Sequence, residues 1–322
     1  MKKIKVNIIG AAGFVGGELV RLLINHPQVE SLTLQSNSQA GKKVGVIHRD
    51  LFDFDLVFSS TYDRLADVTF VSRGHGQSKD FINQLEAKES GVIIDMSRDF
   101  RLLSDNNEFI YGLPEWNRAK IKISKKIANT GCFANAMQLA IYPLVKKQLL
   151  ANDLHMQGVT GSTGAGYAKL DTTHFSWRDS NVSVYKAFTH QHIDEVKQLI
   201  LAHMPDYKND VNFIPMRGNY TRGILITAYT KTGYSSEELT DLYNDVYEYE
   251  PFVSISKEPI DLKQVVNTNK ALIRIEKIDN KVLVTCAIDN LLKGAAGQAV
   301  QNMNINQGFS EDIGLNLKPN AY

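Results

Sequence analysis

Cysteine, long apolar runs and excess charge are all scarce in this chain of 322 residues. Only Cys132 and Cys286 occur, which is too few for a disulfide framework, so a reducing, cytoplasmic setting is expected. No run of about 18 apolar residues exists, and a membrane span is therefore not expected. Lys and Arg total 36 against 35 Asp and Glu, a balance that gives no reason to expect a nucleic-acid or anionic-membrane partner.

The composition is that of an ordinary globular protein, with 43% hydrophobic and 22% charged residues. The length exceeds the size at which one hydrophobic core usually keeps growing, so two domains are expected. The first residues, MKKIKVNIIG, are basic and then apolar, like a secretion signal. The apolar run is too short for that signal, however, and leads directly into a glycine-rich turn.

The first part of the chain alternates predicted strands with predicted helices. Apolar, β-branched runs predict strands, and apolar residues at helical spacing after Gly13 predict a helix. This alternation predicts an α/β fold, a Rossmann-type doubly wound parallel sheet, over residues 1–145. The predicted strands cover residues 5–9, 31–36, 67–72 and 91–97, with a helix at 78–90.

The second part has a different pattern, which predicts an α+β substrate and oligomerisation domain over residues 146–288. Residues 192–204 and 235–250 have helical periodicity, and Ser235 with Glu238 suits a capping box. Strands are expected at 223–232, 271–278 and 281–288, the last two joined by a hairpin at Asp279–Asn280. The small-residue segment 289–322 is expected to form a helix that packs back on the first domain.

A glycine-rich loop, GAAGFVG, follows the first predicted strand and opens a helix. Glycines at such a turn let backbone N–H groups approach a pyrophosphate at the positive end of the helix. The alternative is a tight strand–helix connection without a ligand, because the spacing is G-x-x-G-x-x-G. We predict dinucleotide binding by Gly10, Ala12, Gly13, Phe14, Val15 and Gly16.

The end of the second strand indicates which dinucleotide binds. An NAD site places a carboxylate there, to accept hydrogen bonds from the ribose 2′-OH. This chain has Ser36, Asn37 and Ser38, followed by Lys42 and Lys43. Hydroxyls and nearby cations suit a 2′-phosphate, so NADP(H) is the expected cofactor, bound in part by Ser36 and Ser38. A polar surface loop with incidental lysines is the alternative, because no arginine supplies a clamp.

Cys132 precedes an apolar-periodic stretch and is expected to begin a helix. The positive end of a helix stabilises a thiolate, which is the reactive form of cysteine. A free cysteine is also one of the most frequently buried residues, so the residue type alone leaves a core role open. Cys286 lies in the middle of a predicted strand and is expected to be inert core.

The segment NTGCFAN resembles the active-site cysteine loop of N-acyl-γ-glutamyl-phosphate reductases, which act in arginine biosynthesis. These enzymes are relatives of aspartate-semialdehyde and glyceraldehyde-phosphate dehydrogenases. The resemblance runs nearly the whole chain, through GAAGFVGGEL, IDMSRDFRL, YGLPEWNR, GSTGAGYAK, THQHIDEV, FIPMRGNYTRGIL and DNLLKGAAGQAVQNMN. Ordered motifs of this number are more specific than any one of them.

The resemblance implies a mechanism in which Cys132 attacks the γ-acyl phosphate and forms a thioester, which NADPH reduces to the semialdehyde. A histidine with an ordinary pKa can act as both base and acid. His190 and His192 are the candidates, and on an extended backbone both would face the same side. We favour His190 as the acid–base residue, with His192 contacting substrate. A metal site at this H-x-H pair is the alternative, but no third ligand stands at a suitable spacing, so no metal is expected.

The resemblance also implies the binding residues. Arg101 is expected to hold the substrate phosphoryl group and Arg222 the α-carboxylate, because a guanidinium offers a bidentate fork to either anion. Surface or strand-edge ion pairs, for example with Asp99, are the alternatives, and the role of Arg98 stays open. The other expected contacts are Asn135 and Glu195 with substrate, and Gly164 and Asn290 with the nicotinamide. A homodimer or homotetramer is implied, with an N-acylglutamyl phosphate and inorganic phosphate as the small-molecule partners.

The cysteine loop departs from the family pattern around its nucleophile. This chain has Thr130, Phe133, Ala134 and Asn135 where the family usually has Pro, Tyr, Pro and Thr. These neighbours are expected to shape the acyl pocket, so acetyl is the default acyl group and succinyl remains open. The alternative functions are an aspartate-semialdehyde-type reductase and a catalytically silent NADP-binding regulator.

Overall fold

The computed structural model describes residues 2–74, 76–85, 91–167 and 171–320. The chain divides into two compact units: unit 1 is Met1–Thr130 with Ala295–Asn316, and unit 2 is Gly131–Gly294 with Leu317–Tyr322. The boundaries differ from those expected at 145 and 289, because the helix that begins at Cys132 packs within unit 2. The cysteine therefore belongs to the second unit.

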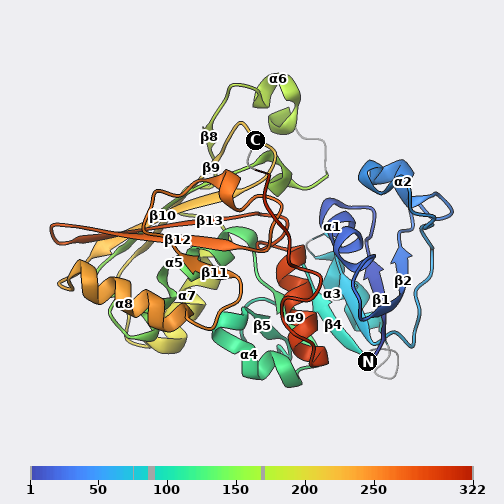
Figure 1. Ribbon diagram of the computed structural model, residues 1–322, viewed down its shortest axis with the longest axis horizontal. Helices are drawn as coiled ribbons and strands as arrows, with labels where there is room; N and C mark the ends of the chain where they lie inside the picture. Colours follow the sequence, from blue (N-terminus) through green and yellow to red (C-terminus); the bar gives the residue numbers. More distant parts are fainter. Residues whose placement is uncertain (1, 75, 86–90, 168–170, 321–322) are drawn as a thin grey trace. The chain divides into compact units, whose positions relative to one another are not determined.

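Unit 1 contains a six-stranded parallel sheet in the order β2-β1-β3-β4-β6-β5 (Figure 1). Its chain enters at β1 and continues to β2 on one side and to β3 on the other, so the carboxyl end of β1 is a topological switch point. The predicted Rossmann-type sheet is confirmed. The strands are β1 (Ile4–Ile9), β2 (Val29–Gln35), β3 (Val68–Val71), β4 (Val92–Asp95), β5 (Ile110–Gly112) and β6 (Lys126–Asn129).

The helices of unit 1 pack on this sheet and on one another. On α3, Phe81 and Ile82 are buried in a cluster that includes Ile9 of β1 and Val71 of β3. The C-terminal helix α9 packs against α1 and α4. Residues 86–90 of the helix predicted at 78–90 lie outside the described part. The helices are α1 (Phe14–Leu23), α2 (Val44–Ile47), η1 (Arg49–Leu51), α3 (Gln77–Gln84), α4 (Pro114–Ile123) and α9 (Ala296–Gln307).

The last helix begins at Ala296, later than the sequence pattern indicated from residue 289. The preceding segment forms turns because the Asp289 carboxylate accepts hydrogen bonds from the N–H groups of Leu291 (2.8 Å) and Leu292 (3.0 Å). A carboxylate used in this way holds the chain in a turn rather than in a helix.

Unit 2 contains a seven-stranded mixed sheet in the order β11-β12-β13-β10-β7-β9-β8 (Figure 1). Its central pairs are antiparallel, whereas β7–β9 and β11–β12 are parallel, in agreement with the predicted α+β domain. Asp279, with φ of 49°, turns the predicted hairpin between β12 and β13. The strands are β7 (Leu154–Thr160), β8 (Ser183–Val184), β9 (Val211–Arg217), β10 (Ile224–Lys231), β11 (Val253–Ile255), β12 (Ala271–Ile278) and β13 (Lys281–Ile288).

Three helices of unit 2, α5, α7 and α8, cover one face of this sheet (Figure 1). Side chains of this face, such as Phe213 and Ile226, are fully buried, whereas their neighbours along the same strands are partly exposed on the other face. The predicted capping box at Ser235 is present. The helices are α5 (Cys132–Lys146), η2 (Ser162–Ala165), η3 (Asp171–Thr173), α6 (Phe175–Arg178), α7 (His192–His203), α8 (Ser236–Tyr247) and η4 (Leu262–Gln264). No helix in the described part of the chain is long and apolar enough to cross a membrane.

Candidate active site

The glycine loop of unit 1 is built by close backbone approach. Gly10 has φ of 79°, and a Cβ there would lie 2.3 Å from the carbonyl oxygen of Ser72. A Cβ on Gly16 would lie 2.6 Å from the carbonyl oxygen of Gly10. The chain can therefore turn sharply from β1 into α1, whose N-cap is Gly13 and whose first turn carries no acidic residue. No side chain caps the positive end of α1, which suits an anion. Pyrophosphate binding by Gly10, Ala12, Gly13, Phe14, Val15 and Gly16 stays a prediction.

The end of β2 carries hydroxyl and amide groups but no carboxylate. Ser36 is buried, and Asn37 accepts a hydrogen bond of 2.6 Å from Gln35. Lys43 forms an exposed ion pair of 2.9 Å with Asp55, and Lys42 donates to Gln39. One of the two cations expected near a 2′-phosphate is thus partly neutralised. The binding roles of Ser36 and Ser38 stay predictions.

Cys132 is the first residue of α5, as predicted, and its side chain is half-buried. Gly131 is the N-cap, and the first turn has no acidic side chain that would oppose a thiolate. Gly294 lies against the cysteine: a Cβ there would be 2.9 Å from the Cβ of Cys132. Any larger residue at 294 would therefore push on the cysteine.

The two histidines lie side by side, but not on the extended backbone that we predicted. Gln191 between them is helical (φ −57°, ψ −21°), and His192 is the first residue of α7. That expectation was wrong because the helix begins inside the H-x-H motif. The His190 and His192 rings are nevertheless 4.6 Å apart between centroids, and both residues are buried.

His190 has a defined protonation state in this position. Burial, and then the nearby charge of Lys186, lowers the pKa of His190 to about 4, so the ring is neutral at pH 7. Its Nδ1 accepts a hydrogen bond of 3.2 Å from the backbone N–H of His192. A neutral imidazole that accepts at Nδ1 carries its proton on Nε2. His190 is therefore a hydrogen-bond donor at Nε2.

Glu195 joins the first turn of α7 to the start of α5. It is almost fully buried, and its Oε2 accepts a hydrogen bond of 2.9 Å from the backbone N–H of Gly131, the residue before the cysteine. Its Oε1 lies 3.9 Å from Nε2 of His192. Glu195 thus lies between the start of α5 and the ring of His192. The predicted contact of Glu195 with substrate stays a prediction.

Asn135 and Phe133 lie in the first turn of α5 beside the cysteine. Asn135 is fully buried, and the ring centroid of Phe133 lies 5.7 Å from that of His190 and 5.1 Å from that of Phe213. The Phe133 ring thus packs beside both histidines. Contact of Asn135 with the acyl group stays a prediction.

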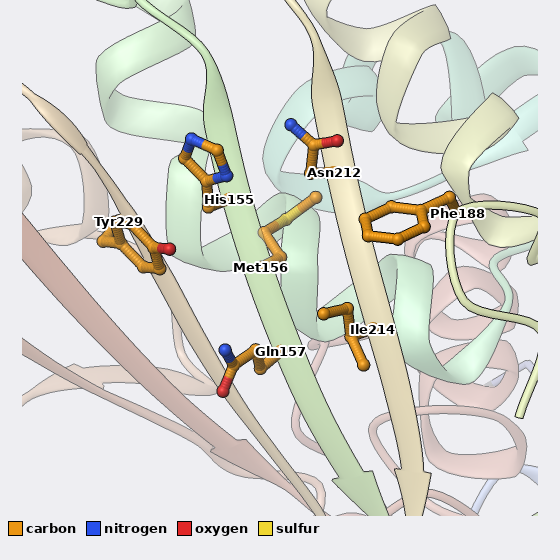
Figure 2. A pocket seen from close by; sticks show the side chains of 7 residues that line it. All are labelled: His155, Met156, Gln157, Phe188, Asn212, Ile214 and Tyr229. Atoms are coloured by element: carbon orange, nitrogen blue, oxygen red, sulfur yellow. The ribbon is translucent and has the colours of Figure 1, made fainter. Parts of the chain in front are cut away.

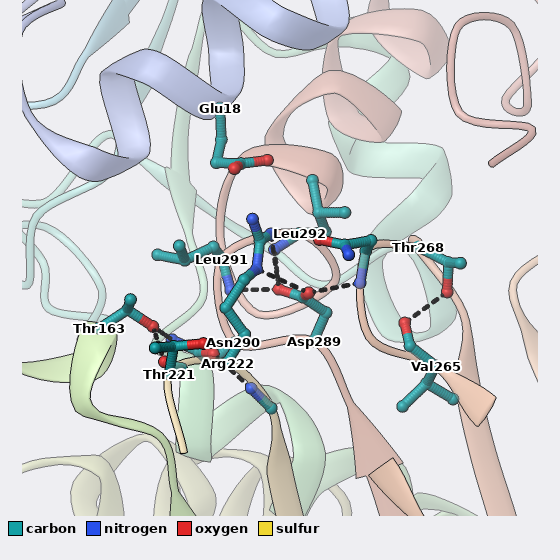
Figure 3. A network of polar contacts seen from close by, with 12 residues as sticks. Glu18, Thr163, Thr221, Arg222, Val265, Thr268, Asp289, Asn290, Leu291 and Leu292 are labelled. Carbon is teal, nitrogen blue, oxygen red and sulfur yellow. Dashed lines mark hydrogen bonds and ion pairs between the residues drawn. The ribbon is translucent and has the colours of Figure 1, made fainter. Parts of the chain in front are cut away.

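Arg222, predicted to hold the α-carboxylate, is bound to a carboxylate of the protein itself. Figure 3 shows its guanidinium against Asp289, with Nε at 3.0 Å and Nη2 at 3.1 Å from the two carboxylate oxygens. Asp289 is fully buried and also accepts from the N–H of Asn267. This bidentate pair is the ion-pair alternative considered for Arg222, and the substrate role is not tested by it.

Asn290, predicted to bind the nicotinamide, holds two loops together (Figure 3). Its Oδ1 accepts from the N–H of Gly223 (2.7 Å), and its Nδ2 donates to Thr163 (3.0 Å) in η2. Gly164 follows in the same 3-10 turn, which ends at Gly166 with φ of 76°. Contact of Gly164 and Asn290 with the cofactor stays a prediction.

Arg101, predicted to bind the phosphoryl group, belongs to unit 1. It is buried, and it donates from Nε to the carbonyl of Asn129 (2.8 Å) and from Nη2 to that of Met96 (2.9 Å). These bonds fix the plane of the guanidinium at the ends of β4 and β6. Its phosphate role stays a prediction.

Sequence reasoning did not single out a tyrosine that packs against His190 or the two arginines that follow it in space. The ring of Tyr185 lies 5.7 Å from that of His190, and the guanidinium carbon of Arg217 lies 5.0 Å from the Tyr185 ring centroid. Burial and then the charge of Cys132 raise the pKa of Tyr185. Arg178 lies beside Arg217 and has its pKa lowered by burial and by that neighbouring charge. The available signal was Arg217 itself, because it lies in the motif FIPMRGNYTRGIL together with Arg222, the only arginine of that motif to which a role was assigned.

Among the residues that the structure describes, no group of three or more His, Cys, Asp or Glu side chains is arranged to hold a metal ion. The chemistry available at this site is thus that of a thiol at a helix start, two adjacent imidazoles and a buried carboxylate. Together these groups suit nucleophilic catalysis at a carbonyl carbon.

Comparison with known families gives matches to both units. Residues 5–124 match the semialdehyde dehydrogenase NAD binding domain, and residues 132–290 match the semialdehyde dehydrogenase dimerisation domain. Solved structures share the fold at low identity. Aspartate semialdehyde dehydrogenase II from Vibrio cholerae superimposes with a TM-score of 0.73 at 17% identity, over 95% of this chain and 98% of that one. The enzyme from Candida albicans, solved with NADP, gives 0.73 at 15% identity, over 97% of this chain and 100% of that one.

Curated relatives are much more similar and span the full length. An N-acetyl-gamma-glutamyl-phosphate reductase from Christiangramia forsetii is 48% identical, over 98% of each chain. Reductases of the same name from Parabacteroides distasonis and Bacteroides thetaiotaomicron are 47% and 46% identical, over 99% of this chain and all of theirs. On this similarity, the chain belongs to the N-acetyl-gamma-glutamyl-phosphate reductase family of the semialdehyde dehydrogenases.

Proposed function

We propose that this protein reduces an N-acyl-γ-glutamyl phosphate to the corresponding glutamate 5-semialdehyde with NADPH, releasing inorganic phosphate, as a step of arginine biosynthesis. The observation that carries the proposal is Cys132 at the start of α5 in unit 2, where the ring of the next residue, Phe133, lies 5.7 Å from that of His190, one of the paired histidines. Family membership supports the substrate class, because the relatives carry this activity in their names.

The nucleophilic step follows from the electrostatics around Cys132. The positive end of α5 stabilises the thiolate, whose sulfur attacks the acyl carbon. The carbon–oxygen bond to the phosphoryl group then breaks, inorganic phosphate leaves, and the acyl group remains on sulfur as a thioester. The thiol proton must go to a base with a free lone pair.

His192 fits the role of that base better than His190. The Nε2 of neutral His190 already carries a proton, because its Nδ1 accepts a hydrogen bond from the backbone. His192 has the Glu195 carboxylate 3.9 Å away, which stabilises the imidazolium that proton uptake creates. His190 instead donates from Nε2 to the substrate oxygen that gains negative charge. This assignment reverses the roles that we favoured from the sequence.

The backbone of the glycine loop and the start of α1 fit the pyrophosphate of NADPH, and Ser36 and Ser38 fit the ribose end. The absence of a carboxylate at the end of β2 is what favours NADPH over NADH. Gly164 and Asn290 are proposed to lie near the nicotinamide. When bound, the cofactor supplies the hydride that reduces the thioester carbon.

The test is phosphate-dependent reduction of NADP⁺ by an N-acylglutamate semialdehyde, the reaction in reverse. Cys132→Ala is expected to abolish turnover while NADPH binding is retained, because the thiol forms the covalent intermediate. Cys286→Ala, which changes the buried cysteine of β13, is the matched control and should remain active. Normal turnover by Cys132→Ala would refute the mechanism.

The same assay separates the two alternatives. An aspartate-semialdehyde-type enzyme would use aspartate semialdehyde in preference to the glutamate derivative. A silent regulator would bind NADPH without turnover of either aldehyde, and Cys132 would show no selective alkylation at neutral pH.

We propose a homodimer formed through the face of the unit 2 sheet that none of the described helices covers. Its outward side chains line a pocket of about 230 Å³ over β7, β9 and β10, shown in Figure 2 with His155, Ile214 and Tyr229. The match of residues 132–290 to a dimerisation domain supports this assignment. Light scattering is expected to give twice the chain mass, and Ile214→Lys to give a monomer. Ile278→Lys, at the exposed hairpin end of β12, is the control.

A reducing compartment is the proposed location. The mechanism needs Cys132 as a thiol, and neither cysteine of the chain forms a disulfide. The cytoplasm keeps such thiols reduced.

A further inference from the structure

Two arginines of unit 2 lie close to one another, and one of them, Arg217, packs on Tyr185. Arg178 is the last residue of α6, and Arg217 is the last residue of β9. Ser183 of β8 connects them: it pairs with Arg217 in the sheet, and its hydroxyl accepts a hydrogen bond of 3.4 Å from Nη1 of Arg178. The charge of Arg217 also lowers the pKa of Arg178, so the two guanidinium groups interact.

Neither guanidinium has a carboxylate partner among the described residues. Arg178 is 6% exposed and donates only to Ser183 and to the carbonyl of Asn181 (2.7 Å). Arg217 donates from Nη1 to the hydroxyl of Thr172 (3.3 Å). The Nε atoms of both arginines are buried without a hydrogen-bond partner in the described structure. Two adjacent cations with buried, unused donors are costly unless an anion binds to them.

The other arginine pairs of this chain show what is missing here. Arg222 binds Asp289, Arg118 binds Glu311 and Arg274 binds Glu276, each with a carboxylate within 3.0 Å or less of a guanidinium nitrogen. In these three pairs the chain itself supplies the carboxylate. At Arg178 and Arg217 no described residue supplies a carboxylate, so a bound anion would supply the negative charge.

Tyr185 connects the arginine pair to the catalytic groups. Its ring lies 5.7 Å from the His190 ring and 5.0 Å from the guanidinium carbon of Arg217. The Tyr185 ring therefore lies next to both His190 and the guanidinium of Arg217. An anion bound to the pair is therefore separated from His190 by the Tyr185 ring, and we place the carbon that Cys132 attacks on the histidine side of that ring.

The proposed substrate has anionic groups at different distances from that carbon. The phosphoryl group is attached to that carbon through one oxygen, and the carbon of the α-carboxylate is four bonds away, beyond three intervening carbons. A carboxylate at the end of a four-carbon acyl group lies about 10 Å away, the length of about three extended residues. Of these three anionic groups, only the carboxylate at the end of the acyl chain extends past the Tyr185 ring, which itself packs against His190.

We propose that Arg178 and Arg217 bind a carboxylate at the far end of the N-acyl group, so that the preferred substrate carries a dicarboxylic acyl group such as succinyl rather than acetyl. This inference rests on the proposed function and names the acyl group that the sequence left open. A paired guanidinium site is suited to a carboxylate because each group offers parallel N–H donors.

The experiment compares N-succinylglutamate and N-acetylglutamate semialdehydes in phosphate-dependent NADP⁺ reduction. The unmodified protein is expected to prefer the succinyl substrate at least about tenfold in kcat/KM. Arg217→Leu is expected to lower kcat/KM for that substrate about 10- to 100-fold, the usual cost of losing hydrogen bonds to a charged group, and to lower the acetyl value much less. Lys208→Leu, which removes a positive charge from an exposed loop of unit 2, is the control and should change neither value.

Other results would overturn the inference. An equal loss with both aldehydes would assign the pair to the α-carboxylate, and a raised KM for phosphate alone would assign it to the phosphoryl group. A preference of the unmodified protein for the acetyl substrate would overturn the inference but leave the proposed function intact. Turnover of neither aldehyde would refute the function itself.

A binding measurement provides a second readout and a second variant. N-succinylglutamate is expected to bind the Cys132→Ala protein more tightly than N-acetylglutamate by calorimetry, and Arg217→Lys should reduce that difference because an ammonium lacks the planar fork. Arg217→Lys retains the charge and tests the pair if the leucine variant does not fold. Equal affinity of the two acylglutamates would overturn the proposal.

Discussion

The glycine loop of unit 1 and the cysteine site of unit 2 are built in opposite ways. In the loop, the site is formed by backbone groups, and Gly10 and Gly16 are required because neighbouring carbonyls occupy the space that a side chain would need. At the cysteine site, buried side chains do the work: Glu195 bonds to the N–H of Gly131 and lies near His192. The glycine loop is therefore sensitive to added atoms, whereas the cysteine site is sensitive to a changed charge.

The difference follows from what each site must stabilise. A pyrophosphate is already charged before it binds, so backbone N–H groups and a helix end suffice. The reaction at Cys132 creates and moves charge, so it needs groups with matched pKa values in fixed positions. A substitution that adds atoms should therefore impair mainly the glycine loop, and a substitution that removes a charge should impair mainly the cysteine site.

The largest effect is expected from Gly10→Ala in the loop. The added Cβ would lie 2.3 Å from the Ser72 carbonyl oxygen, and φ of 79° is strained for alanine. We expect a loss of more than about 3 kcal/mol in the free energy of unfolding and a more than 100-fold weaker NADPH affinity. Chemical denaturation and NADPH fluorescence titration measure the two effects.

Gly41→Ala is the matched control for the loop. Gly41 has φ of 83°, but no atom lies within 4 Å of an added Cβ. Only the backbone strain remains, about 1 kcal/mol. Equal destabilisation by Gly10→Ala and Gly41→Ala would contradict the role given to the Ser72 contact.

At the cysteine site, Glu195→Gln is expected to have the next largest effect. The amide keeps the shape of the side chain but removes the negative charge 3.9 Å from His192. We expect kcat/KM to fall roughly 10²-fold with NADPH affinity unchanged, since the charge acts on proton transfer. Asp194→Asn, an exposed neighbour in the same helical turn, is the control. A variant with altered KM but unchanged kcat would show that Glu195 contacts substrate instead.

How much of each site could be predicted from the sequence follows from the same comparison. The loop was predictable because strand, glycines and helix follow one another within Ile4–Leu23. The start of α5 at Cys132 was likewise a local pattern of apolar residues. The parallel sheet followed from the alternation of strands and helices, apart from short strands such as Ile110–Gly112, which contain too few residues for a pattern.

The cysteine site was only partly predictable because its contacts join distant segments. Glu195 bonds to Gly131 across 64 residues, and Arg222 pairs with Asp289 across 67. Motifs named these residues, but no local pattern gives their partners. Tyr185 had no sequence signal at all, because its significance arises only from its packing between His190 and Arg217.

A third prediction concerns acid stability and the burial of His190. Its pKa of about 4 lies below the unfolded value of 6.5, so the unfolded state binds more protons between these values, and stability falls as the pH falls through that window. From pH 7 to pH 5 the contribution is about 2 kcal/mol. His190→Gln should therefore lose about that much of the pH dependence measured by urea denaturation.

The exposed His174 provides the control, because His174→Gln removes a histidine from the N-cap position of α6 without removing a buried ring. His26 in unit 1 also has its pKa lowered by burial, and it contributes equally in all three proteins. An unchanged pH dependence in His190→Gln would show that the ring is not held neutral.

The smallest effect is expected at the ribose end of the cofactor site, where the lysines are exposed. Lys42 donates to the neutral Gln39, whereas Lys43 is already paired with Asp55. We expect Lys42→Gln to weaken NADPH binding about threefold and Lys43→Gln to weaken it less, since exposed charges contribute little and are screened by salt. NADH affinity should not change in either variant, because NADH has no 2′-phosphate. Equal weakening of NADPH and NADH would mean that this loop does not face the 2′-phosphate, and the preference for NADPH would then need another source.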